Sequence, residues 1–134
     1  MKKKVLEDTQ EALSIIDKAE KLQKKAATVG FDWQNGDQIV NKIEEELNEV
    51  REVITNGKVQ EDLSDEIGDL IFSCINLARY YQIDSENALK NTNNKFIKRF
   101  NYIEDALRKK NLSILDVDLK EMDKLWEESK NNTI

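Results

Sequence analysis

The chain has no proline in 134 residues, and this absence constrains its fold more than any other single feature. Proline is the strongest helix breaker, because its ring fixes φ and removes a backbone donor. Apolar residues recur every three or four positions along most of the sequence, and no long stretch alternates apolar and polar residues as a strand does. The sequence therefore predicts long amphipathic helices and an all-α fold.

Interruptions of the apolar stripes predict where the first two helices end. We expect a first helix over about residues 5–27, closed by the segment 29–36 with its two glycines and two aromatic residues. The second helix carries apolar residues from Ile39 to Ile54. It should stop at Asn56 and Gly57, which tolerate the left-handed conformation at a helix end.

Three further helices complete the predicted fold. The third has a stripe made of Leu63, Ile67, Leu70, Cys74, Leu77 and Tyr81. The fourth starts near Asp84 and Ser85, and its stripe consists of Leu89, Phe96, Phe100, Ile103 and Leu107. A fifth spans about 118–129, and residues 130–134 form a polar tail. We predict one domain over residues 1–134, resembling a four-helix bundle with an additional C-terminal helix.

Several kinds of site are excluded by what the chain lacks. Without histidine there can be no Ser-His-Asp relay, imidazole zinc site or histidine-containing di-iron site. The single cysteine, Cys74, cannot form an internal disulfide, and no apolar run approaches the roughly 20 residues that span a bilayer. We expect a soluble cytoplasmic protein that contacts no membrane. The net charge of −6 argues against stable nucleic-acid binding.

Charge is distributed unevenly along the sequence. Residues 44–69 hold ten acidic and two basic side chains, whereas residues 90–110 hold seven basic and two acidic ones. These faces can simply be solvated and attract each other. Four carboxylates fit that interpretation less well, because they lie at the edges of apolar stripes in i, i+3 pairs. The pairs are Glu46 with Glu49 and Glu66 with Asp69.

Carboxylates at the edge of a buried apolar stripe need a positively charged partner. A set of ligands made only of oxygen atoms suits Mg²⁺ or Mn²⁺. Glutamate-rich helices also produce this spacing by chance, so a solvated edge stays an alternative. Lys95 and Arg99 share a helix face and can neutralise a polyphosphate, or form ordinary salt bridges. Trp33 and Trp126 can each stack on a base or pack in the core.

Ordered motifs over most of the chain resemble a known family. They are Gly30 to Trp33, Lys42 to Val50, Asp65 to Phe72, Asn76 to Arg79, Asn93 to Phe100, Val117 to Leu119 and Met122 to Trp126. These segments are similar to the MazG nucleoside triphosphate pyrophosphohydrolases, specifically to the catalytic C-terminal domain of the two-domain bacterial form. The resemblance implies an all-α NTP pyrophosphatase fold and a dimer or higher homo-oligomer. It also implies Mg²⁺-dependent cleavage of NTPs or dNTPs between the α and β phosphates, which yields a monophosphate and pyrophosphate.

The resemblance also implies residue roles. Glu46, Glu49, Glu66 and Asp69 would hold the metal, and Glu45 would support the site. We nominate Glu49 as the general base, with Glu45 or Glu46 as alternatives. The substrate would be held by Lys42, Lys95 and Arg99 at its phosphates and by Asn93 and Trp126 near the nucleotide, with Trp33 as a further stacking candidate.

The chain departs from the family pattern in places. The 134 residues resemble only one of the two tandem domains, and we expect a standalone version of it. Asp62 stands where the two-domain enzyme has a basic residue, and residues 91–95 differ from the family motif. Two other interpretations follow. One is a dUTP/dCTP-type or phosphoribosyl-ATP pyrophosphohydrolase of the same superfamily. The other is a non-catalytic helical adaptor, in which the charged faces are only interaction surfaces.

Overall fold

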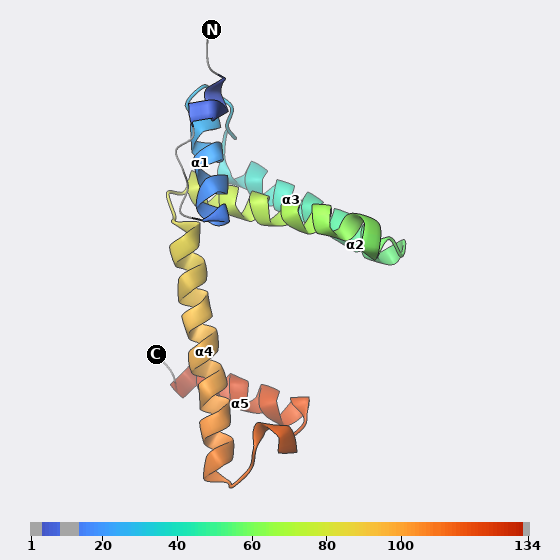
Figure 1. Ribbon diagram of the computed structural model, residues 1–134, viewed down its shortest axis with the longest axis vertical. Coiled ribbons are helices and arrows are strands. Elements are labelled where there is room, and N and C mark those ends of the chain that lie inside the picture. Colours follow the sequence, from blue (N-terminus) through green and yellow to red (C-terminus); the bar gives the residue numbers. More distant parts are fainter. Residues whose placement is uncertain (1–3, 9–13, 133–134) are drawn as a thin grey trace. The chain divides into compact units, whose positions relative to one another are not determined.

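The computed structural model describes residues 4–8 and 14–132 (Figure 1). These residues form five α-helices and two short 3₁₀ helices, and none of them lies in a strand. The predicted all-α class, with four main helices and a C-terminal fifth, is therefore confirmed for the described part of the chain. The chain divides into two compact units, residues 1–86 (unit 1) and residues 87–134 (unit 2).

Unit 1 is built around the antiparallel hairpin of α2 (Gly36–Thr55) and α3 (Val59–Tyr80), which lie side by side in Figure 1. The Asn35 side chain caps α2 by accepting a hydrogen bond from the Gln38 backbone N–H at 3.0 Å. The connection between the helices turns at Gly57, whose φ of 71° is left-handed and favours glycine. The predicted stop at Asn56 and Gly57 is confirmed.

The first helix, α1 (Ile15–Ala27), packs against α3. The prediction of one helix over residues 5–27 is wrong, because Val5–Asp8 form a 3₁₀ helix (η1) and α1 begins only at Ile15. The physical reason is a cap: Ser14 has an extended backbone, and its Oγ accepts from the Asp17 backbone N–H at 3.0 Å. Residues 9–13 of the predicted helix lie outside the described residues.

The predicted stripe of α3 is also wrong in part. Ile75 and Ser73 are buried, whereas Cys74, Ile67 and Tyr81 are exposed. Within unit 1, α3 contacts α1 as well as α2, and these two contacts select a different buried face from the one that periodicity alone favours. On α2, in the same way, Ile39 is buried but Leu47 and Ile54 are exposed.

Unit 2 contains most of α4 (Ser85–Lys109), the 3₁₀ helix η2 (Ile114–Asp116) and α5 (Leu119–Asn132). Its core consists of Ile103, Leu107 and Leu125, with Ala106, Ile114, Val117 and Trp126 packed against them. The C-terminal half of the α4 stripe is thus buried as predicted, whereas Leu89, Phe96 and Phe100 are exposed.

The predicted polar tail is helical as far as Asn132, so the prediction fails for residues 130–132. Asn132 Nδ2 donates to the Glu128 carbonyl at 2.9 Å, and Lys130 pairs with Glu127 at 3.1 Å, which extends the last turns. Residues 133–134 are outside the described part. Across the described ranges, no helix is both long and apolar enough to cross a bilayer.

Candidate metal and nucleotide site

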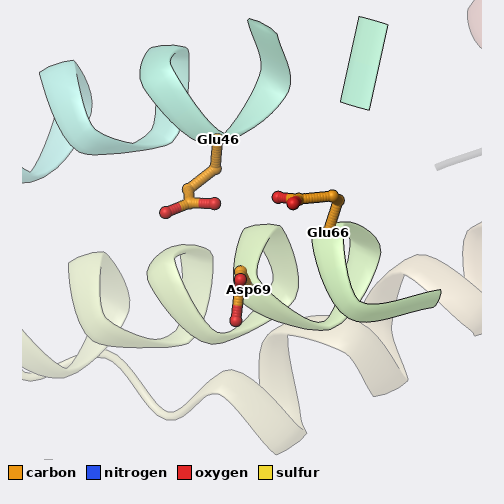
Figure 2. A group of neighbouring side chains, drawn as sticks. All are labelled: Glu46, Glu66 and Asp69. Carbon is orange, nitrogen blue, oxygen red and sulfur yellow. The ribbon is translucent and has the colours of Figure 1, made fainter. Parts of the chain in front are cut away.

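Carboxylates from α2 and α3 converge between the two helices. Glu46 on α2 and Glu66 and Asp69 on α3 each offer a carboxylate oxygen, and these oxygens lie within 4.8 Å of one another. Figure 2 shows Glu46 and Glu66 extending from opposite helices into the space between them. The predicted i, i+3 pairs thus face each other across the hairpin.

Glu46 is the most buried member of this group, with 5% of its surface exposed. Its Oε1 atom pairs with Lys42 Nζ at 3.1 Å, but its Oε2 atom is buried and has no hydrogen-bond partner within the described residues. Glu66 Oε2 is likewise buried, without a hydrogen-bond partner in the part of the chain that the structure describes. Burying a carboxylate oxygen without a hydrogen-bond partner costs free energy, and a bound cation or a proton would lower this cost.

Glu49 is the fourth carboxylate of the site. Its hydrogen bond to Glu66 is the main cause that raises the pKa of Glu66 from 4.5 to about 7, followed by burial and by repulsion from Glu49, Asp69 and Glu46. A proton shared by two neighbouring carboxylates is what a dense negative cluster holds when no metal is present. We call Glu46, Glu49, Glu66 and Asp69 the carboxylate cluster.

The carboxylate cluster fits a hard divalent cation. Its donors are all oxygens, and their spacing allows several of them to reach one ion. Two of these carboxylates, Glu46 and Glu66, each have a buried oxygen without a hydrogen-bond partner over residues 4–8 and 14–132. Lys42 flanks the cluster and pairs with Glu45 Oε1 at 3.2 Å as well as with Glu46. These two pairings, first with Glu46 and then with Glu45, raise the pKa of Lys42, which stays charged. Glu45 itself is exposed.

A cavity of about 570 Å³ opens beside Lys42 within unit 1. Its wall is mainly apolar and aromatic, and Trp33 forms part of it; the full set is Leu6, Leu22, Gln23, Ala26, Gly30, Phe31, Asp32, Trp33, Ile39, Lys42, Phe72, Ser73, Asn76 and Arg79. In this wall the Arg79 guanidinium donates two hydrogen bonds, of 2.6 and 3.0 Å, to the Asp32 carboxylate. These bonds lower the pKa of Asp32 below its ordinary value and tie the loop that carries Trp33 to α3.

The remaining predicted substrate residues belong to unit 2. Arg99 lies over the Trp126 ring, with its guanidinium carbon 5.6 Å from the ring centroid. Phe96 also packs on Trp126, at a centroid distance of 5.4 Å. Asn93 and Lys95 are exposed on α4. The structure therefore brings Arg99 and Trp126 together, while Asn93 and Lys95 remain open to solvent.

Comparison with known sequences decides the family. Residues 34–103, just over half of the chain, match the MazG nucleotide pyrophosphohydrolase domain. The chain belongs to this family. The MazG match contains all four residues of the carboxylate cluster, together with Lys42, Glu45, Asn93, Lys95 and Arg99. Trp33 and Trp126 lie outside the matched residues.

Two curated relatives resemble this MazG protein over most of its length. It is 38% identical over 112 residues to the nucleoside triphosphate pyrophosphohydrolase/pyrophosphatase MazG of Thermotoga maritima, covering 84% of this chain and 42% of the relative. It is 37% identical over 130 residues to the nucleoside triphosphate pyrophosphohydrolase of Escherichia coli K12, covering 96% of this chain and 49% of the relative. The chain thus spans less than half the length of either protein.

Sequence reasoning missed several polar residues around the cavity. Gln23, Asp32, Asn76 and Arg79 were given no role, although three of them lie in segments that carry the MazG resemblance. One signal was available: Arg79 is a lone cation at the end of an apolar helical run, and Asp32 is a lone acid between two aromatic residues. A charge in apolar surroundings needs an oppositely charged partner, and Arg79 and Asp32 form a salt bridge with each other.

Proposed function

We propose that this MazG domain hydrolyses nucleoside triphosphates, NTPs or dNTPs, between the α and β phosphates, giving a nucleoside monophosphate and pyrophosphate. One observation carries the proposal: Glu46 is buried close to the carboxylates of Glu66 and Asp69, and one of its oxygens has no hydrogen-bond partner among the residues described. A site of this kind costs stability unless a cation occupies it. The two curated relatives, both described as nucleoside triphosphate pyrophosphohydrolases, support the reaction class.

We assign Mg²⁺ to the carboxylate cluster, with Mn²⁺ as a substitute. The all-oxygen donor set favours hard cations, and the chain has no histidine to favour softer ones. When bound, such an ion neutralises phosphate oxygens and lowers the pKa of nearby water. The ligands are Glu46, Glu49, Glu66 and Asp69, of which Glu46 is the most firmly held because it is buried and anchored by Lys42.

The chain's own residues then position the substrate and move a proton. Glu49 is the proposed general base, since it already shares a hydrogen bond with Glu66 inside the cluster. Glu45 and Glu46 are the alternatives, and Glu45 also keeps Lys42 in place. Charge on the phosphates is neutralised by Lys42, Lys95 and Arg99, and the nucleoside is contacted by Asn93, Trp33 and Trp126.

The proposal extends to assembly and location. The long helices expose large apolar side chains, among them Leu47 on α2 and Ile67, Ile71 and Phe72 on α3. A homodimer or higher homo-oligomer would bury such side chains. We propose that the protein works in this form in the cytoplasm, and light scattering that gives a monomer at working concentration would refute the oligomer.

Variants of the cluster test the function. With Mg²⁺ and a panel of nucleoside triphosphates, the wild-type protein should release pyrophosphate. Glu49→Gln and Asp69→Asn should each reduce that release at least 100-fold, because each removes a charge from the reacting site. The matched control is Glu61→Gln on the exposed first turn of α3, which should keep wild-type activity. Equal activity in all four proteins would refute the assignment.

A further inference from the structure

The cavity beside Lys42 has features that the carboxylate cluster does not use. Residues of η1, α1, α2, α3 and the loop before α2 line it, and Trp33, Phe31 and Phe72 give it aromatic walls. Aromatic surfaces bind planar heterocycles by stacking, with little preference for one ring over another. Selectivity in such a cavity has to come from polar groups in its wall.

Gln23 on α1 is the most deeply buried polar group of that wall. Only 7% of its surface is exposed, and its Nε2 atom donates to the Phe72 carbonyl at 3.0 Å. This bond fixes the orientation of the Gln23 amide, so that its Oε1 atom lies on the side of the amide away from the Phe72 carbonyl. Oε1 is buried and has no hydrogen-bond partner among the described residues. A buried acceptor without a donor is unfavourable, so a ligand N–H group at this point would be bound.

Asn76 on α3 supplies the complementary group. Its Oδ1 atom accepts hydrogen bonds from Arg79 Nε at 2.9 Å and from Arg79 Nη2 at 2.7 Å. Because a guanidinium only donates, the Asn76 oxygen must face Arg79, and its amide nitrogen is left as a donor in the cavity wall. Gln23 therefore adds an acceptor to the wall, and Asn76 adds a donor.

Lys42 on α2 connects the cavity to the carboxylate cluster, because it contacts both. Lys42 lines the cavity and also pairs with Glu46 at 3.1 Å. Ile39 at the cavity and Glu46 in the cluster are two helical turns apart, about 10 Å along the axis. A ligand with a planar ring in the cavity can therefore extend its other end past Lys42 toward the cluster.

We propose that this cavity binds the nucleobase, and that Gln23 Oε1 selects it by accepting an N–H group from the hydrogen-bonding edge of the base. The inference rests on the proposed function, since it places the base of the same triphosphate whose phosphates meet Lys42 and the cluster. The ligand class is a planar heterocycle with an N–H donor next to an acceptor, stacked against aromatic side chains. Asn76 donates to that neighbouring acceptor.

The test combines a protein change with a ligand change. The α,β-methylene analogues of ATP, CTP, GTP and UTP are titrated with Mg²⁺ into the full chain by calorimetry. The base that binds most tightly is then compared with its analogue in which the donor nitrogen carries a methyl group. Proteins compared are the wild type, Gln23→Leu and the matched control Gln60→Leu, whose side chain is exposed on α3.

In the wild type and in Gln60→Leu, N-methylation of the base should weaken binding about tenfold or more, because it leaves the buried Gln23 oxygen without a donor. In Gln23→Leu, methylation should change binding less than twofold. A merely structural role for Gln23 would leave the methylation effect equal in all three proteins and would overturn the inference.

The two proposals fail in different ways. If the wild type cleaves triphosphates but N-methylation leaves its binding unchanged, only the base site is refuted. If no triphosphate is bound or cleaved, the proposed function fails and the base site fails with it. A Gln23→Leu protein with a lowered melting temperature does not remove the test, because the effect of methylation on wild-type binding is measured without any substitution.

Discussion

Lowering the pH from 8 to 6 should weaken metal binding at the carboxylate cluster, because a proton on Glu66 competes with the cation. The pKa of Glu66 in the metal-free protein is about 7, raised mainly by its hydrogen bond with Glu49. Roughly 90% of this group is ionised at pH 8 and roughly 10% at pH 6. Since the metal needs the ionised form, its apparent affinity should fall about tenfold across this interval.

The raised pKa of Glu66 also determines how the folding stability of the metal-free protein depends on pH. Between about pH 4.5 and 7 the folded protein holds a proton on Glu66 that the unfolded chain has lost. Stability therefore falls as pH rises through this window, and the loss is complete above it. Bound Mg²⁺ should remove this penalty, so the metal-free and metal-loaded melting temperatures should diverge as pH rises.

Differential scanning calorimetry at pH 5.5 to 8, with EDTA or with Mg²⁺, measures both effects. Mg²⁺ at 100 times its Kd stabilises by about 2.7 kcal/mol, which corresponds to about 5 to 10 °C for a chain of this size. Glu66→Gln should lose the Mg²⁺ shift and the pH dependence together, whereas Glu61→Gln on the same helix should keep both. A Mg²⁺ shift that is equal at pH 6 and pH 8 would refute the reasoning.

Three other predictions concern the folds of the two units. Asp32→Asn breaks the bidentate pair with Arg79, whose side chain is 8% exposed, and should lower the free energy of unfolding in urea at pH 7 by about 1 to 2 kcal/mol. This figure is discounted for solvent screening, because the Asp32 side chain is 28% exposed. Asp105→Asn, in the exposed pair with Arg108, is the control, and an equal loss there would contradict the prediction. Because the pKa of Asp32 is lowered, its contribution should be complete above pH 4 and disappear at more acidic pH. Leu107→Ala in the core of unit 2 should cost about 3 kcal/mol, against less than about 0.5 for Leu115→Ala at a 91% exposed position, and similar melting curves would argue against the described core. Ser14→Ala should lower stability by about 1 kcal/mol through loss of the α1 cap, and an unchanged midpoint would show that α1 does not start there.

The carboxylate cluster could be predicted because local signals place its members. The turn at Asn56 and Gly57 is readable from the sequence, and it joins α2 and α3 into an antiparallel hairpin. Glu49 and Glu66 lie eight and nine residues from Gly57, and Glu46 and Asp69 lie eleven and twelve residues from it. Equal distances from a tight turn bring residues to the same level of a hairpin, so spacing alone indicates which carboxylates meet.

The cavity could not be predicted in this way, because it depends on packing between distant segments. Gln23 is buried only because α1 lies against α3, a contact that helical periodicity does not specify. Periodicity also continued the first helix through Ser14, where a single side-chain cap begins the real one. Polar residues that pair across long sequence distances, such as Asp32 and Arg79, become visible only with the fold.

The products of the reaction test the central claim most directly. Phosphorus NMR of a nucleoside triphosphate incubated with the full chain and Mg²⁺ shows which bond is cleaved. Our account predicts a nucleoside monophosphate and pyrophosphate in equal amounts, with no signal change when EDTA is present or when Asp69→Asn replaces the wild type. A nucleoside diphosphate with orthophosphate, or cleavage that persists in the Asp69→Asn protein, would contradict it.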